Sequence, residues 1–467
     1  MKKFFCVLML VALLAVCVVL PACKSNSDNA DGRIKVSFYH TMGTNLRPVL
    51  QKYIAKFNEE HPEIFIAEEA IGGYNDVRDQ VINELQAGKQ PAIAYAYADH
   101  VATYLRSRKV VDLNTYINDP EVGLTQAQKD DFIQGYYAEG SAFGDPTKMY
   151  TLPFSKSTEV MYYNIDKFNE LHLAVPDHWF AADDNDTTSL EYVIKALKAS
   201  DPNCLPLGYD SEANWFITMC EQLGTPYTAA ADRVEDRFLF NNDGNIAFLN
   251  KFREWYQAGL LTTQEDFGSF TSGLFVNQKP NDQGVIVKSY ISIGSSAGAT
   301  HQCPAALADG SYPFQVGIAE IPQAVATNKK VISQGPSLVM LKQKNTAVND
   351  AAWLFIKYLL TNSNFQAEFS MASGYVPVLK SAFSLPGYEA FLEDAGTDMN
   401  GIAALSAKIC MEQEEHYFTS PAFIGSSDAR DQVGEMLLKY MSSKDGSETA
   451  LRKIVQDAVN RCISNNK

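Results

Sequence analysis

Apolar and polar positions in the first third of the chain alternate between strand spacing and helix spacing. From Arg33 to His40 apolar residues recur at every second position, which predicts a strand. Two more strands are expected at residues 64–68 and 91–97, and the segments between the three strands carry apolar residues at helical spacing. This βαβαβ order predicts a mostly parallel sheet covered by helices.

The rest of the chain continues the same alternation. Further strands are expected at residues 159–163, 285–293 and 331–341, and amphipathic helices at residues 190–197, 241–261 and 351–360. A last pair of helices follows residue 430. Because 467 residues exceed the size of one compact core, we expect an α/β protein of two domains.

The first 23 residues have the composition of a targeting segment. Two lysines precede an apolar run from Phe4 to Leu20, and Cys23 follows Leu-Pro-Ala. This order resembles a bacterial lipoprotein signal, in which Cys23 becomes the lipidated first residue. An uncleaved membrane anchor or ordinary secretion is the alternative, and in either case the rest of the chain lies outside the cytoplasm. The polar residues 24–32 predict a flexible tether.

Composition narrows the classes of partner. Hydrophobic residues make up 46% and charged residues 20%, which is typical of a globular protein. The formal net charge is −16, so nucleic acid and other polyanions are not expected as partners.

Cysteine spacing gives no sign of a metal site. Five cysteines follow the targeting segment, so at most two disulfides can form, and Cys204 and Cys220 are the nearest pair. No CxxC or Cys/His cluster is present, and we interpret the acidic run 183–186 as a solvated loop before a helix. We expect no metal and no cofactor.

Three short hydroxyl side chains precede the strand at 159–163. Ser155, Ser157 and Thr158 flank Lys156 directly after Leu-Pro-Phe. Hydroxyls on an extended backbone can hydrogen-bond a polar ligand without filling the space that it needs. The alternative is an ordinary strand whose entry turn is rich in serine and threonine.

This stretch carries a family resemblance. Leu152-Pro153-Phe154, Ser157-Thr158 and Met161-Tyr162-Tyr163-Asn164 are similar to the hinge segment of extracellular solute-binding proteins of carbohydrate ABC importers. Within that family the chain most resembles the glycerol-3-phosphate-binding branch. The resemblance implies a type II periplasmic-binding-protein-like fold, with two lobes joined by three hinge crossings. We expect one lobe from residues 33–148 and 291–338, and the other from residues 149–290 and 339–467.

The resemblance also implies ligand contacts along the chain. His40, Tyr74 and Asp99 follow strands of the first lobe, where open α/β sheets bind ligands, although His40 could equally be a satisfied turn histidine. The other expected contacts are the hydroxyl residues named above and, further along the chain, Trp215, Ser295, Ser296, Gly335, Tyr375 and Arg430. The alternatives are a core position for Trp215 and a structural turn for Tyr375.

Two departures from the glycerol-3-phosphate branch bear on the ligand. Phe423 lies where that branch carries a phosphate-binding arginine, and Ala98 replaces its cleft glutamate. A buried phosphate without a guanidinium partner is costly, so a neutral sugar or polyol is the first expectation. Glycerol 3-phosphate or a glycerophosphodiester is the alternative.

The implied protein is not an enzyme but a monomeric receptor that delivers its solute to the transmembrane subunits of an ABC importer. A competing hypothesis comes from residues 294–298, which match Gly-x-Ser-x-Gly after a strand. Ser296 would then be the nucleophile of an esterase, with Asp394 or Asp398 and His416 as its partners. An adhesin or sensor of the same fold, working without a permease, is a third possibility.

Overall fold

The computed structural model describes residues 29–467 except 31 and 395. The expected targeting segment 1–23, its lipidation residue Cys23 and most of the expected tether lie outside these residues. Within the tether, β1 (Asn29–Ala30) pairs antiparallel with β2 (Arg33–His40), so this part is a short strand and not free chain. None of the helices in the described residues combines the length and apolar character needed to cross a bilayer.

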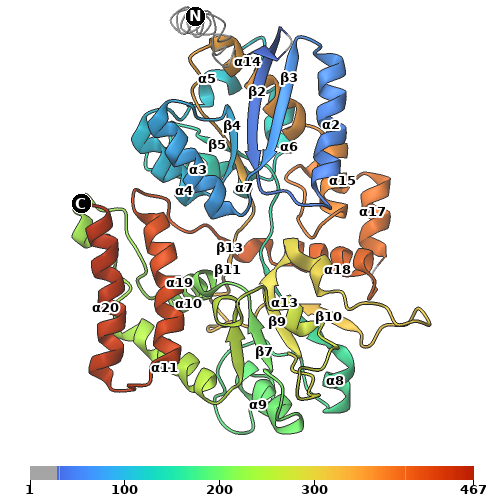
Figure 1. Cartoon of the computed structure of the whole chain (residues 1–467), viewed down its shortest axis with the longest axis vertical. Helices are drawn as coiled ribbons and strands as arrows, with labels where there is room; N and C mark the ends of the chain where they lie inside the picture. The colour runs from blue at the N-terminus through green and yellow to red at the C-terminus, as the bar shows by residue number, and fades with distance from the viewer. Residues whose placement is uncertain (1–28, 31, 395) are drawn as a thin grey trace, which may run out of the picture.

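The first sheet forms the centre of one lobe, drawn uppermost in Figure 1. Its strands run in the order β1-β2-β4-β12-β5. β3 also pairs with β2, along the edge opposite to β1 and β4. The pairs β2–β3 and β2–β4 are parallel, as the βαβαβ pattern predicts, whereas β12 is antiparallel to both neighbours. The remaining strand bounds are β3 Ile64–Ala70, β4 Ile93–Ala96, β5 Thr151–Pro153 and β12 Ser337–Met340.

Helices cover this sheet because their apolar faces have the spacing that the sequence predicts. α2 buries Leu50, Tyr53, Ile54 and Phe57, and α14 supplies Trp353 and Phe355 to the same core. The helices of this lobe are α2 Arg47–Glu60, α3 Tyr74–Ala87, α4 Ala98–Tyr104, α5 Asn114–Ile117, α6 Gln126–Asp131, α7 Gln134–Ala138, α14 Thr346–Leu360, α15 Ser363–Met371, α16 Lys380–Phe383 and α17 Pro386–Glu393.

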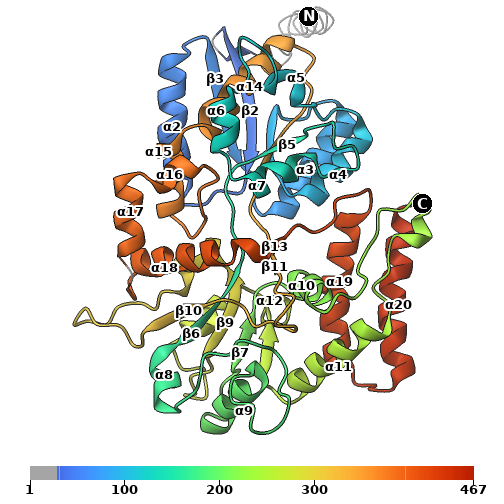
Figure 2. The same cartoon turned by 180° about the vertical axis from the view of Figure 1, so that it is seen from behind.

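A second sheet forms the other lobe, in the order β10-β6-β9-β7-β8. Its strands are β6 Glu159–Asn164, β7 Leu207–Tyr209, β8 Leu261–Thr263, β9 Ile291–Ser295 and β10 Val316–Ala319. Around it lie α8 Ile165–Glu170, α9 Leu190–Ser200, α10 Glu212–Leu223, α11 Asp243–Gln257, α12 Gln264–Phe267, α13 Ser272–Phe275, α19 Ser426–Ser442 and α20 Glu448–Asn465. Figure 2 shows this lobe from behind, with α19 and α20 at its outer side.

The chain passes between the lobes three times. Residues 154–158 join β5 to β6, and residues 333–336 join β11 (Val331–Ile332) to β12. The third passage runs through α18 (Met399–Glu412), which lies at the junction of the lobes and packs on α17 and on β10. It continues into β13 (Tyr417–Phe418), which pairs in parallel with β11.

The expected assignment of the C-terminal half to the lobes is wrong in two places. β9 and β10 pair with β6 in the second sheet, so most of segment 291–338 belongs to the second lobe. In contrast, α14 and α15 pack in the core of the first lobe. The expected lobe bounds imply one crossing near residue 291 and another near residue 338. The chain does not cross near residue 291, because β9 pairs with β6 and β7 in the second sheet, and the second crossing lies at residues 333–336.

The five cysteines in the described residues carry free thiols. Cys204 and Cys220 are both buried in the core of the second lobe without being joined. The sulfur of Cys220 donates to the Asn245 side chain, and that of Cys204 faces a backbone carbonyl of α9. These thiols act as small apolar core groups.

Candidate functional site

A cavity of about 830 Å³ lies between the lobes. From the first lobe it is lined by Thr41, Gly73, Tyr74, Asn75, Asp76, Tyr97 and Tyr375. From the hinge and the second lobe it is lined by Ser157, Glu159, Asp210, Ser211, Asn214, Gln264, Phe270, Ser272, Ser295, Ala297, Gly298, His301, Gln302, Gln334 and Arg430. Its volume is in the upper part of the range of about 300–1,000 Å³ that is usual for small-molecule sites.

Three tyrosines form the first-lobe wall. Tyr74 begins α3 two residues after Gly72, whose φ of 126° suits glycine, and Tyr97 directly follows β4. The rings of Tyr74 and Tyr97 lie 4.4 Å apart, and the hydroxyls of Tyr74 and Tyr375 are hydrogen-bonded at 3.0 Å. This wall presents apolar ring faces together with hydroxyl groups.

Hydroxyls and a carboxylate form part of the opposite wall. Ser295 at the end of β9 donates to Ser157 at 3.3 Å, so the expected hydroxyls of two different segments meet in this cavity. Asp210 lies close by because Gly294 has no side chain. A Cβ at that position would be 2.7 Å from the Asp210 carboxylate.

Glu159 is the most deeply buried acid in the cavity wall, with 1% of its surface exposed. Tyr209 donates to its carboxylate at 2.6 Å, and Arg430 donates to the neighbouring Asn214. Burial raises the pKa of Glu159 to about 7, although hydrogen bonds from Tyr209 and Asn214 and the charge of Arg430 oppose the rise. Burial also raises the pKa of Asp210.

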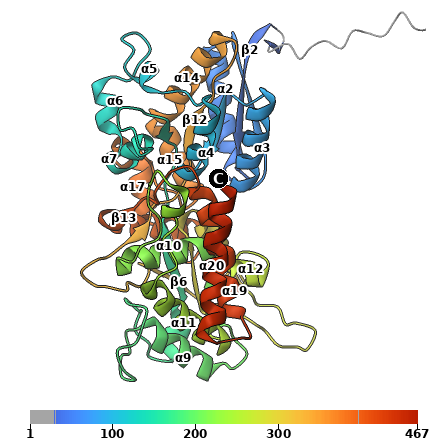
Figure 3. The ribbon, with the colours of Figure 1, turned by 90° about the vertical axis from the view of Figure 1, so that its left-hand side faces the viewer.

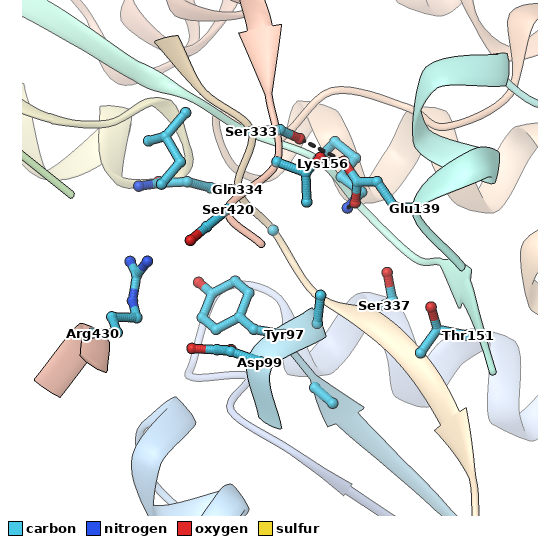
Figure 4. A pocket seen from close by; sticks show the side chains of 15 residues that line it. Tyr97, Asp99, Glu139, Thr151, Lys156, Ser333, Gln334, Ser337, Ser420 and Arg430 are labelled. Carbon is cyan, nitrogen blue, oxygen red and sulfur yellow. Dashed lines mark hydrogen bonds and ion pairs between the residues drawn. The ribbon is translucent and has the colours of Figure 1, made fainter. Parts of the chain in front are cut away.

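A smaller pocket of about 50 Å³ adjoins the cavity, and both share Tyr97, Gln334 and Arg430 (Figure 4). Two further expected contacts, Asp99 and Gly335, line this pocket. Gly335 has a φ of 95°, and a Cβ there would lie 2.2 Å from the carbonyl oxygen of Ser155. The first and second crossings therefore pack backbone against backbone.

A buried ion pair at one side of this pocket ties the crossings together. Lys156 pairs with Glu139, which also accepts from Ser333 at 2.9 Å and from Thr419 at 3.1 Å (Figure 4). Lys156, Ser333 and Thr419 belong to the first, second and third passages between the lobes. The Lys156–Glu139 group thus joins all three.

Five of the expected contacts line neither the cavity nor the smaller pocket, namely His40, Ser155, Thr158, Trp215 and Ser296. His40 is fully buried, its ring is hydrogen-bonded to Glu68 at 2.8 Å, and burial lowers its pKa. This is the satisfied turn histidine of the alternative hypothesis. Ser155 is buried within the first crossing. The Thr158 hydroxyl is also buried and donates to the carbonyl of Ile332.

Trp215 is a core residue and not a ligand contact. It is fully buried, and its ring stacks on Tyr209 at 4.6 Å and on Phe252 at 3.8 Å. The turn before α10 positions it, but the helix directs the indole into the second-lobe core. Phe423 likewise packs on Phe238 and is not among the lining residues.

Ser296 lacks the surroundings of a hydrolytic nucleophile. It is fully buried, and its hydroxyl contacts the backbone N–H of Thr158 and the sulfur of Cys410. In the described part of the chain no histidine hydrogen-bonds to it, and His416 lies on a separate short helix, Glu414–His416.

Four residues that line the cavity were not expected from the sequence, namely Tyr97, Glu159, Asp210 and Asn214. Tyr97 and Asp210 come directly after strands β4 and β7, so the rule that ligands bind at strand ends could have found them. Glu159 begins the mostly apolar and aromatic strand β6, and its place in the site depends on Tyr209 and Asn214, which are distant in the sequence.

Comparisons with known proteins agree with this architecture. A family profile described as bacterial extracellular solute-binding protein matches residues 52–393. The sn-glycerol-3-phosphate-binding periplasmic protein UgpB of Escherichia coli O1:K1 is 24% identical over 383 residues, covering 79% of this chain and 80% of its own.

Solved structures share the fold. UgpB from Mycobacterium tuberculosis in complex with glycerophosphocholine has a TM-score of 0.71 at 16% identity, covering 92% of this chain and 98% of that one. Maltose-bound MalE3 of T. maritima has a TM-score of 0.69 at 13% identity, covering 91% and 98%.

Proposed function

Because this chain belongs to the bacterial extracellular solute-binding proteins, we propose that it binds a neutral sugar or related polyol between its lobes and delivers it to an ABC importer. The main support is that the two walls of one cavity differ in chemistry. Tyrosines of the first lobe line it together with acids and serines of the second. Aromatic faces suit the apolar C–H faces of a sugar ring, and carboxylates accept hydrogen bonds from its hydroxyls.

The charges of the cavity favour a neutral solute over a phosphate. Arg430 is the only arginine or lysine among the described residues that line the larger cavity, and it already donates to Asn214. Glu159 and Asp210 line the same space. Because Asp76 lines the cavity as well, a dianion placed here would meet three acids and one partly engaged guanidinium, which is unfavourable away from water.

Glycerol 3-phosphate or a glycerophosphodiester is the second candidate. Arg430 supports it, since a guanidinium in the wall is a natural partner for a phosphate. The glycerol-3-phosphate-binding and glycerophosphocholine-bound relatives support it as well.

A thermal-shift screen separates the two candidates. Mono- and oligosaccharides, glycerol 3-phosphate and glycerophosphocholine are compared by the rise in melting temperature with concentration. We expect saccharides to give the larger rise. A larger rise with either phosphate compound would reverse the assignment.

We further propose that Cys23 carries a lipid anchor and that the protein acts as a monomer with the permease subunits of the importer. The evidence for the anchor is the order of charged, apolar and small residues before Cys23. Metabolic labelling with a radioactive fatty acid tests it in the producing bacterium. Label should enter the wild-type protein and be lost in Cys23→Ala.

A further inference from the structure

Phe270 is the most exposed large hydrophobic residue in the described part of the chain, with 62% of its surface accessible. A single exposed phenylalanine needs no explanation on most surfaces. Phe270, however, lines the same cavity as Tyr74 and Arg430. Phe270 is therefore an exposed aromatic residue at the border of the space where the solute is proposed to bind.

The backbone beneath this ring is held firmly. Thr271 is fully buried, and both its N–H and its hydroxyl donate to one carboxylate oxygen of Asp210, at 2.6 and 2.7 Å. Gly208 in β7 permits this approach, because a Cβ there would lie 2.6 Å from the Thr271 side chain. The backbone next to Phe270 is therefore held in place, which lowers the entropy cost of ordering this segment around a ligand.

Polar groups accompany the ring. Gln264 precedes Phe270 and Ser272 follows it, and both line the same cavity. An aromatic face with an amide and a hydroxyl nearby has the chemistry of a sugar subsite, because the ring covers a C–H face while the polar groups bond the hydroxyls.

The size of the cavity leaves room for such a subsite. At about 830 Å³ it is large enough for a drug-sized ligand, and a single sugar ring is smaller than that. The three tyrosines belong to the first lobe and Phe270 to the second, so the cavity has two separate aromatic surfaces.

We propose that Phe270 is the platform of a second sugar-ring subsite and that the solute is an oligosaccharide of at least two rings. This inference rests on the proposed function. One ring occupies the wall of Tyr74, Tyr97 and Tyr375, and the next stacks on Phe270 with Gln264 and Ser272 beside it.

Isothermal titration with matched saccharides tests the inference. The probes are glucose, galactose, mannose and xylose, each beside its α- and β-linked disaccharide and trisaccharide. We expect the best oligosaccharide to bind the wild-type protein at least tenfold more tightly than its monosaccharide. Phe270→Ala should lower oligosaccharide affinity about tenfold more than monosaccharide affinity, whereas Phe270→Trp should retain the wild-type preference.

Phe267→Ala is the matched control. Phe267 lies three residues earlier, is 40% exposed and is not among the lining residues of the cavity. Equal affinity for monosaccharide and oligosaccharide, or an unchanged preference in Phe270→Ala, would overturn the inference and leave the proposed function standing. Binding of no saccharide by the wild-type protein would overturn both.

Discussion

Arg78 on α3 of the first lobe donates to Asp431 on α19 of the second lobe at 2.8 Å. The same guanidinium nitrogen donates to Ser427 at 3.1 Å. Figure 3 shows the upper end of α19 meeting the first lobe beside α4. The Arg78 side chain is 14% exposed, so this ion pair is better shielded from water than most surface pairs. It joins the two lobes without lining the cavity.

Arg78→Ala is expected to favour the open form. The substitution removes a contact that holds the two lobes in the arrangement described here, so we expect solute affinity to fall roughly three- to tenfold. Small-angle X-ray scattering of the ligand-free variant should give a larger radius of gyration. Arg452→Ala is the control, because Arg452 pairs with Asp243 and Glu448 inside the second lobe. Equal radius and affinity in Arg78→Ala would contradict this role.

Glu159 should make stability depend on pH. Its pKa rises from 4.5 to about 7 on folding, because burial penalises the charged form. The folded protein therefore holds this proton more tightly than the unfolded chain does. The resulting stabilisation is complete below pH 4.5 and is lost as the pH rises through about 7.

Urea unfolding of the wild type and of Glu159→Gln, measured from about pH 4 to about pH 8, tests this effect. The free energy of unfolding of the wild type should fall relative to the variant by up to about 3 kcal/mol. Glu170→Gln, a change at an exposed position of α8, should give a curve parallel to the wild type. A pH-independent difference between wild type and Glu159→Gln would refute the assignment.

Glu159→Gln also tests whether the cavity discriminates against anionic solutes. Glu159→Gln removes a negative charge from the cavity wall, so affinity for glycerol 3-phosphate should rise relative to that for a neutral saccharide. Saccharide affinity itself should fall about tenfold, because a charged acceptor becomes a neutral one. Titration of both ligands at pH 8 gives the two values. An unchanged ratio would show that Glu159 does not select by charge.

Tyr375→Phe isolates one hydroxyl of the tyrosine wall. It removes the 3.0 Å hydrogen bond to Tyr74 and a group available to the solute, so affinity should fall about three- to tenfold. The free energy of unfolding should change by only about 1 kcal/mol. Tyr116→Phe is matched to it, since Tyr116 loses a 3.0 Å bond to Asp350 away from the cavity. Parallel affinity losses in both variants would argue against a contact from Tyr375.

Trp215 should matter for stability alone. Trp215→Ala leaves a void between Tyr209 and Phe252, and we expect it to lower the free energy of unfolding by about 3–5 kcal/mol. Trp215→Phe keeps part of the packing, so its loss should be smaller and its solute affinity close to wild type. Denaturant unfolding and titration measure the two quantities. A large affinity loss in a stably folded Trp215→Phe would place this residue at the ligand after all.

The sequence predicted elements better than their assembly. Apolar periodicity located β2, β3, α2 and α11 because each buries one face along a regular repeat. It could not tell that β9 stays in the second sheet while β12 returns to the first, since both strands are short and apolar. Strand partners are chosen by tertiary contacts that leave no local signal.

The sequence likewise predicted some residues of the site and not others. Ser157, Ser295, Tyr74, Tyr375 and Arg430 line the cavity as expected. Trp215 and His40 do not, because the direction of a side chain depends on the helix or strand that carries it and not on the turn beside it. Glu159 was missed because a lone acid in an apolar strand acquires its role only from Tyr209 and Asn214, which lie about fifty residues away.

The parallel pairing of β11 with β13 makes one ribbon of the second and third passages between the lobes. Glu139 and Lys156 fasten the first passage to that ribbon. Three connections joined in this way resist sliding more than bending, so we expect the lobes to move by rotation about a single axis. Rotation about one axis would give the receptor two distinct conformations. A membrane partner that binds one of them more tightly would thereby distinguish an occupied cavity from an empty one.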